Sequence, residues 1–129
     1  MDITSYLLGR NVSGGTGGGV TIDSGSNENG FYIKFSNGDV IQYGIIIVES
    51  GHTYADLTFP VEFNDTDYTI ISNAFFSGSS YGGSGAITTF TAVEKNGKTG
   101  CYVYSWNKSG DTALNFNRKV SWLAIGKWK

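Results

Sequence analysis

An Asn-Gly pair between two alternating apolar runs constrains the fold of this chain more than any other feature. The pair, Asn37-Gly38, lies inside the segment NGFYIKFSNGDVIQYG, which runs from residue 29 to residue 44. Asn and Gly tolerate the positive φ that a two-residue type I′ turn needs at both central positions. The segment therefore predicts a β-hairpin.

The two-residue turn also predicts how the side chains of this hairpin pair. Phe35 would lie opposite Val40, and Tyr32 would pair with Tyr43 on the face that also carries Ile41. That face has more apolar surface than a solvated strand normally shows. We therefore predict that Tyr32, Ile41 and Tyr43 contact a partner subunit. The opposite face is expected to enter the core with these side chains of the first strand: Phe31, Ile33 and Phe35.

Turn residues divide the rest of the chain into short apolar runs. Gly accounts for 19 of the 129 residues and Pro for 1, while 40% of the residues are hydrophobic. No helical periodicity persists, so helix content should be small. These features predict an all-β domain, an antiparallel β-sandwich of about six to seven strands. The expected strands span residues 31–36, 39–48, 53–59, 67–76, 86–95, 100–107 and 119–128.

The N-terminal part differs in composition from the remainder. An apolar segment, SYLLG, is followed by the glycine run of residues 14–19. Such runs behave as flexible tethers, and the Gly-Lys-Ser/Thr ending of a phosphate-binding loop is absent. We predict a Gly-rich arm over residues 1–29, of which residues 1–19 bind other proteins of the same particle, and a β-sandwich domain over residues 30–129. Whether the arm is extended or forms a folded strand stays open.

A second Asn-Gly pair, Asn96-Gly97, predicts a second hairpin. With a two-residue turn, one face carries small apolar side chains, and Cys101 and Val103 enter the core with Phe90 and Ala92. The other face is a ladder of threonine and aromatic side chains: Thr89, Thr91, Tyr102, Tyr104, Trp106 and Ile87. This ladder suits packing, a subunit interface or a flat aromatic platform, and the residues leave all three open.

Charge and composition exclude several classes of function. The net charge is −2, with 9 scattered Lys and Arg residues, so nothing favours a nucleic-acid or anionic-membrane partner. No apolar run approaches a membrane span, and the N-terminus lacks the basic region of a signal peptide, so we expect synthesis in the cytoplasm. The single cysteine, Cys101, excludes an intrachain disulfide framework and is expected to be a buried thiol.

No constellation of catalytic residues is present in the sequence. His52 is the only histidine, so a zinc site of the usual kind cannot form within one chain, although three copies could share a metal on a threefold axis. None of the 11 carboxylates is marked as an acid/base pair, and no Gly-x-Ser-x-Gly segment occurs. We expect a non-enzymatic protein that needs no cofactor.

Two polar loops have the composition of recognition loops. The segment of residues 77–85 contains one tyrosine, Tyr81, among serines and glycines, and the segment of residues 106–111 begins with Trp106-Asn107. Tyrosine offers a large contact area for few lost rotamers, and function usually resides in loops on a rigid scaffold. With the neighbouring ladder, the expected ligand-binding residues are Tyr81, Tyr104, Trp106 and Asn107.

Three segments in order resemble conserved blocks of the C-terminal domain of phage tail-fibre proteins. They are NGFYIKFSNGDVIQYG, LTFPVEF and SWLAIGKW, which begin at residues 29, 57 and 121. Two departures occur, since Tyr43 replaces a usual Trp and Lys127-Trp128 shifts the closing aromatic by one position. The resemblance implies a small β-sandwich similar to the H-type lectin fold. It also implies a homotrimer at the fibre tip and recognition of the bacterial surface.

The sequence therefore predicts a trimeric, non-enzymatic tail-fibre domain in the virion that binds a bacterial cell-surface polysaccharide. Three alternatives stay open. The first is a purely structural virion protein, the second a free carbohydrate-binding lectin, and the third a glycan hydrolase. The apolar segment and glycine tether favour attachment over a free lectin, and the absence of a catalytic cluster disfavours the hydrolase.

Overall fold

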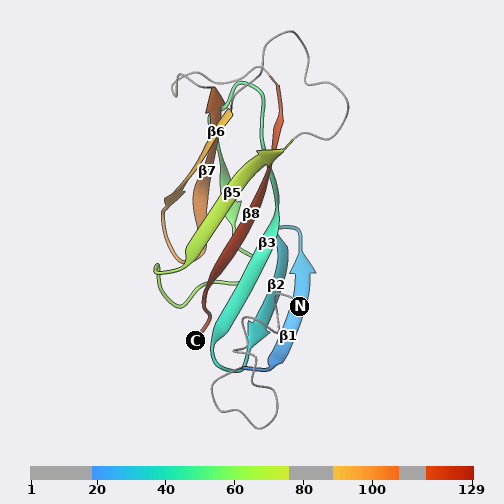
Figure 1. Ribbon diagram of the computed structural model, residues 1–129, viewed down its shortest axis with the longest axis vertical. Coiled ribbons are helices and arrows are strands. Elements are labelled where there is room, and N and C mark those ends of the chain that lie inside the picture. The colour runs from blue at the N-terminus through green and yellow to red at the C-terminus, as the bar shows by residue number, and fades with distance from the viewer. Residues whose placement is uncertain (1–18, 76–88, 108–115) are drawn as a thin grey trace.

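The protein is an all-β sandwich of two antiparallel sheets (Figure 1). The computed structural model describes residues 19–75, 89–107 and 116–129. One sheet has the strand order β1-β2-β3-β8-β5 and the other β4-β7-β6. In chain order the strands are β1 (Thr21–Asn27), β2 (Gly30–Phe35), β3 (Asp39–Val48), β4 (Tyr54–Thr58), β5 (Thr69–Phe75), β6 (Thr89–Lys95), β7 (Gly100–Asn107) and β8 (Arg118–Lys127). The described residues contain no helix, so the predicted fold class is confirmed.

The expected strands coincide with β2 to β8, and β1 is an additional strand. It pairs with β2 from Thr21↔Phe35 to Asn27↔Gly30 at the edge of the larger sheet. Residues 21–27 lie in the predicted N-terminal arm. For this arm the sequence leaves two structures open, an extended segment and a folded strand, and residues 21–27 form a strand. Most of the segment predicted to bind other proteins of the particle lies in residues 1–18, outside the described residues. The predicted boundary between the arm and the sandwich domain at residue 29 stays a prediction.

The core lies between the two sheets and is formed by alternate residues of their strands. Val40 and Val48 of β3 and Val120 of β8 are fully buried, as is Val103 of β7. Cys101 lies in the same cluster at 1% exposure, which confirms the predicted buried thiol. Burial of each large apolar side chain stabilises the fold by about 1.5–3 kcal/mol, so this cluster holds the sheets together.

The first hairpin forms, but its predicted register is wrong by one residue. The backbone N–H of Gly38 donates to the carbonyl of Phe35 (3.0 Å), and Gly38 has a φ of 95°. The connection is therefore a three-residue loop, Ser36 to Gly38, with glycine in the left-handed position. Because strand side chains alternate, this shift places Phe31 and Ile33, and not Tyr32, on the same face of the sheet as the side chains of β3 that they adjoin. The observed pairs are Phe31↔Tyr43, Tyr32↔Gln42, Ile33↔Ile41 and Lys34↔Val40.

The second hairpin shows the same kind of error. Val93 pairs with Val103, and Ala92 pairs with Tyr104, so Ala92 lies on the ladder face rather than with Cys101. The connection runs over residues 96–99, longer than the predicted turn, because it is bound to a distant segment. The N–H groups of Phe59 and Phe63 donate to carbonyls in this connection, at 2.8 and 3.0 Å.

The segment Phe59–Phe63 is fixed to the larger sheet by a buried side chain. Gln42 is fully buried, its Nε2 donates to the carbonyl of Val61 (2.9 Å), and its Oε1 accepts from the Val61 N–H (2.8 Å). Phe59 packs edge-to-face on Phe63, with ring centroids 4.9 Å apart. The sequence block LTFPVEF therefore closes the sandwich over the first hairpin.

Arg118, fully buried, connects the two sheets at the other end of the sandwich. Its Nη2 donates to the carbonyls of Ser105 in β7 (2.7 Å) and His52 (2.5 Å). Its Nη1 donates to the carbonyls of Glu49 (3.2 Å) and Phe116 (2.6 Å). Burial lowers the pKa of the guanidinium from its ordinary value. Arg118, from β8 of the larger sheet, therefore binds a carbonyl of the smaller sheet, the turn after β3 and the segment just before β8.

Strand β8 lies inside the larger sheet, between β3 and the edge strand β5 (Figure 1). It pairs with β3 along its whole length, from Asp39↔Lys127 to Val48↔Arg118, and with β5 from Thr69↔Ile125 to Phe75↔Lys119. Strands β1 to β3 are thus joined to β5 by a strand from the far end of the sequence.

Candidate functional site

The outward face of the larger sheet is strongly apolar. Ile45 and Ile71 are each 61% exposed. Cross-strand pairing places Tyr43, Leu123 and Ile71 in one row, which continues to Phe31 on β2. Contiguous exposed apolar surface of this kind is a feature of interaction sites. We call this surface, which also includes Ile47, the aliphatic face.

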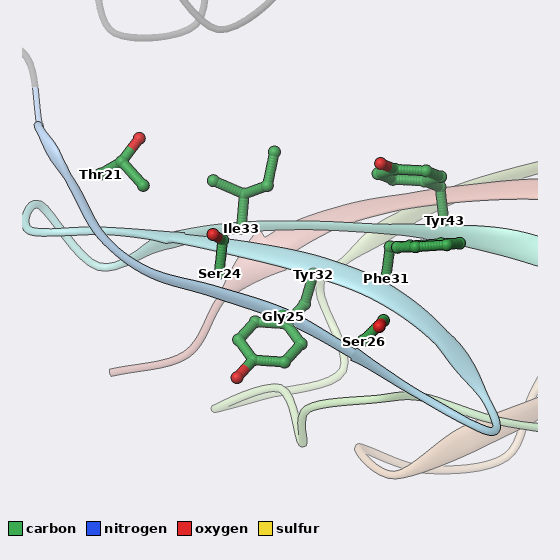
Figure 2. Close-up of a pocket in the computed structure, with 8 residues that line it drawn as sticks. All are labelled: Thr21, Ser24, Gly25, Ser26, Phe31, Tyr32, Ile33 and Tyr43. Carbon is green, nitrogen blue, oxygen red and sulfur yellow. The ribbon is translucent and has the colours of Figure 1, made fainter.

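The predicted interface residues do not share one face. Ile41 and Tyr43 lie on the aliphatic face, where Ile41 is 4% exposed and Tyr43 is 43% exposed. Tyr32 projects from the opposite side of the sheet, as Figure 2 shows. Its hydroxyl donates to a carboxylate oxygen of Asp23 (3.2 Å). Desolvation, and then the charge of Asp23, raise the pKa of Tyr32. The expectation that Tyr32 joins Ile41 and Tyr43 is therefore wrong.

The outward face of the smaller sheet carries the predicted aromatic ladder. Tyr102, Tyr104 and Trp106 alternate along β7, and the rings of Tyr104 and Trp106 are 5.0 Å apart. Strand β4 adds Tyr54, whose ring centroid lies 5.2 Å from Tyr102 and 5.5 Å from Tyr104. We call these four residues the aromatic ladder. Sequence reasoning missed Tyr54 because only the pairing of β4 with β7 brings it there.

A carboxylate lies at the edge of the aromatic ladder. The hydroxyl of Tyr104 donates to Oε2 of Glu94 on β6 (2.7 Å). This hydrogen bond and, after it, desolvation raise the pKa of Tyr104, so the phenol stays protonated at neutral pH. Asp56 of β4 is exposed opposite Tyr102. The surface combines aromatic planes with fixed hydrogen-bonding groups, the combination that sugar rings require.

Two of the four expected ligand-binding residues can be placed on the aromatic ladder. Tyr104 and Trp106 lie side by side in it, and Asn107 is the last residue of β7. Tyr81, with the loop of residues 77–85, and residues 108–111 of the second predicted loop lie outside the described residues.

A stacked pair of exposed rings lies at the β1–β2 end of the aliphatic face. Phe31 and Tyr43 are 5.2 Å apart with an interplanar angle of 14°, and Figure 2 shows both rings projecting from the same side of the sheet. A hollow of about 410 Å³ lies on the β1 side, beside Ser24 and Ser26. Another of about 530 Å³ lies beside Asn29 and the other residues of the β1–β2 turn. Sequence reasoning missed this arrangement because it rests on the Phe31↔Tyr43 register.

The remaining candidate residues show no catalytic arrangement. His52 is exposed, as expected, and its Nδ1 lies 3.3 Å from the Ser50 carbonyl oxygen. Burial raises the pKa of Cys101 to about 11, which keeps the thiol protonated. Within residues 19–75, 89–107 and 116–129, no group of three or more His, Cys, Asp or Glu side chains could hold a metal ion. The same residues include no helix long and apolar enough to cross a membrane.

Comparison with known proteins identifies one family. A family model described as "Putative tail fiber protein gp53-like, C-terminal" matches residues 34–127. A comparison with curated proteins gives no match.

Solved tail fibres of bacterial pyocins have a similar fold. A C-terminal part of the P. aeruginosa R2 pyocin fibre is 19% identical with a TM-score of 0.60, over 86% of this chain and 27% of that chain. The corresponding part of the P. aeruginosa R1 pyocin fibre is 23% identical with a TM-score of 0.55, over 92% and 32%. An N-truncated R1-type fibre is 22% identical with a TM-score of 0.54, over 85% and 88%. This chain thus spans about a third or less of the two longer fibre structures.

Proposed function

Because the chain belongs to the gp53-like family of tail-fibre C-terminal domains, we propose that it is the receptor-binding tip of a trimeric tail fibre and binds a bacterial cell-surface polysaccharide. Membership of the family implies a place in the virion tail and association with other tail proteins. The proposed activity is recognition without catalysis. Residues 1–19 are proposed to provide the contact with the rest of the tail.

The observation that carries the proposal is the different chemistry of the two outward faces of the sandwich. The aliphatic face exposes isoleucines, which make no directional contacts and suit a protein partner. The aromatic ladder exposes rings together with hydroxyl and carboxylate groups. One face therefore suits subunit contact and the opposite face suits a sugar ligand, as a fibre tip requires.

The trimer is proposed to form through the aliphatic face. Ile45 and Ile71 are both 61% exposed, and transfer of such side chains out of water stabilises an interface by about 25 cal/mol per Å² of apolar area. Tyr43 keeps its proposed interface role at the rim of this face, and Ile47 extends the contact, whereas Ile41, at 4% exposure, has little surface left for a partner. Tyr32 is omitted because it lies on the other side of the sheet.

The polysaccharide is proposed to lie across the aromatic ladder. A sugar ring has an apolar side formed by C–H groups, which stacks on an aromatic face, while its hydroxyls need hydrogen-bond partners. Tyr104 and Trp106 supply adjoining rings, and Glu94 and Asp56 supply acceptors at the edge. Tyr81 and Asn107 are proposed to extend this site.

Two other functions would use the same two outward faces of the sandwich. A purely structural tail protein would use the ladder for contact with a neighbouring tail protein. A free lectin would bind sugars without attachment to a particle. The tail-fibre family favours attachment over the free lectin.

The test is binding of the full chain to an array of purified bacterial surface polysaccharides, repeated with Trp106→Ala and Tyr104→Ala. We expect specific binding that each substitution weakens at least about tenfold, the effect of losing one aromatic contact. Circular dichroism and thermal unfolding must show that both variants stay folded. Absence of binding to every polysaccharide and to bacterial cells would favour the purely structural function.

A further inference from the structure

The stacked rings of Phe31 and Tyr43 are the most exposed aromatic pair on the larger sheet among the described residues. Phe31 is 49% exposed and Tyr43 is 43% exposed, and neither belongs to the core cluster. Their parallel stack, which Figure 2 shows, presents an apolar plane to solvent, and both rings line the two adjoining hollows. Both hollows are open to solvent and adjoin the same pair of rings, so a ligand lying on the rings would reach both.

Both hollows are lined by polar groups that can form hydrogen bonds with a ligand. On the β1 side these are the hydroxyl groups of Ser24 and Ser26. On the turn side they are Asn27, Glu28 and Asn29, with Ser121 of β8 beyond them. Asn27 is held in place, since its Nδ2 donates to the Pro60 carbonyl (3.4 Å) and its Oδ1 accepts from the Asn29 N–H (2.9 Å).

Gly30 and Gly44 let the backbone pack closely against the indole of Trp122 beside the larger hollow. A Cβ at Gly44 would stand 3.1 Å from Trp122 Nε1, and a Cβ at Gly30 would stand 2.6 Å from the Tyr43 carbonyl oxygen. Trp122 is 3% exposed, and within the described residues its N–H has no hydrogen-bond partner. This nitrogen is shielded from the hollow, so the indole contributes a rigid apolar wall and not a hydrogen bond to a ligand.

The charge of the lining residues limits which ligands the two hollows can bind. Glu28 is the only charged side chain among the described residues that line the two hollows. A phosphate or uronate group placed there would meet a carboxylate and no cation, which disfavours anionic polymers. Hydroxyl and acetamido groups suit the serine and asparagine side chains, and an amine would be favoured by Glu28.

We infer that Phe31, Tyr43 and the adjoining hollows form a second binding site, which takes uncharged or amine-bearing sugar residues rather than phosphate-bearing ones. The inference rests on the proposed function, because it takes the ligand to be a surface polysaccharide. The site lies at the β1–β2 margin of the aliphatic face, whereas Ile71 lies on β5 at the far edge of that sheet. Tyr43 and Ile45 line the larger hollow and also belong to the proposed trimer contact, so the site lies at the rim of that contact.

The test uses an array of purified bacterial polysaccharides that includes uncharged, amine-bearing and phosphate-bearing polymers. The full chain is compared with Phe31→Ala, which removes the stacked plane, and with Ser121→Tyr, which fills the larger hollow. Ile22→Ala is the matched control, because Ile22 is 51% exposed on β1 and lines neither hollow. Light scattering and thermal unfolding of each variant must match the unmodified chain.

We expect the bound polymers to be uncharged or amine-bearing, and both site variants to bind about tenfold more weakly while Ile22→Ala binds unchanged. Binding only to phosphate-bearing polymers would overturn the inference. Unchanged binding by both site variants, with loss in Trp106→Ala, would overturn the second site and leave the proposed function intact. Absence of binding to every polymer would overturn both.

Discussion

Gln42 and Val61 form a reciprocal pair of hydrogen bonds, in which the buried amide both donates to and accepts from one backbone residue. This pair joins the centre of the larger sheet to the segment that closes the sandwich. The two residues are 19 positions apart in the sequence and belong to different sequence blocks. The pair explains on physical grounds why a glutamine lies in the middle of an apolar strand.

Replacement of Gln42 by Leu should destabilise the domain, because the N–H and carbonyl of Val61 lose their partners. The expected cost is roughly 1–3 kcal/mol for each backbone group left unpaired. Urea unfolding at pH 7 gives the measurement. Gln42→Glu is the informative second variant, since a carboxylate can accept but not donate. The free energy of unfolding of Gln42→Glu should rise as the pH falls, because the buried carboxyl then gains a proton and can donate. A loss of stability that does not depend on pH would contradict the role of the two hydrogen bonds.

Replacement of Arg118 by Met should cost roughly 3–5 kcal/mol, because several buried carbonyl groups lose a charged donor at once. The control is Lys119→Met, the adjacent exposed residue, which should change stability little. Chemical unfolding of both variants measures the difference. Equal stability of the two would show that Arg118 is not needed to connect the sheets.

Gly30→Ala should be more destabilising than Gly51→Ala. Both glycines have positive φ, 143° and 80°, so each substitution adds backbone strain of about 1–3 kcal/mol. Only Gly30 also faces a steric conflict, with the Tyr43 carbonyl oxygen, whereas a Cβ at Gly51 meets nothing within 4 Å. Thermal unfolding of the two variants side by side separates the shared strain from the clash. Equal losses would contradict the close packing at Gly30.

Stability should fall as the pH rises above about 9. Burial raises the pKa of Cys101 from 9.0 to about 11, and burial with the Cys101 charge raises that of Tyr68 from 10.0 to about 12. The unfolded chain therefore releases these protons at lower pH than the folded chain, so the free energy of unfolding decreases through this window. Urea unfolding between pH 7 and 11 measures it. Cys101→Ala should retain only the later decline due to Tyr68, and a stability that rises with pH would contradict the prediction.

Ile71→Asp and Ile45→Asp should convert a trimer into monomers. Each would place an unpaired charge in the proposed contact, at a cost of roughly 3–5 kcal/mol. Ile22→Asp, on exposed β1, is the control and should leave the mass near that of three chains. Light scattering gives the mass, and circular dichroism shows whether the fold persists. A monomeric unmodified chain would remove the interface proposal.

Seven strands and the alternation along β7 could be predicted from the sequence, since each depends on local pattern. Cys101 and Val103 point inward and Tyr104 and Trp106 outward, as the period of two requires. The edge strand β1 was not predicted as a strand, because its segment, TIDSGSN, lacks apolar alternation and depends on pairing with β2.

The register of both hairpins could not be read from the Asn-Gly pairs alone. In the first, Ser36 belongs to the loop, and this one extra residue exchanges the faces of β2. In the second, hydrogen bonds from Phe59 and Phe63 lengthen the connection. The stacked pair of Phe31 and Tyr43 and the place of Tyr54 beside Tyr104 follow from these non-local contacts, so the candidate site was only partly predictable.

The position of β8 between β3 and β5 affects how the larger sheet forms during synthesis of the chain. Strands β3 and β5 flank it and share no ladder with each other, so the larger sheet stays in two pieces until residue 127 has left the ribosome. Contacts between segments so distant in sequence close slowly, because the loop entropy must be lost before any pairing is gained. During that interval the apolar edges of β3 and β5 are free to pair with other nascent chains. Formation of the larger sheet should therefore depend on how fast β8 is added and pairs, more than on the stability of the sheet once formed.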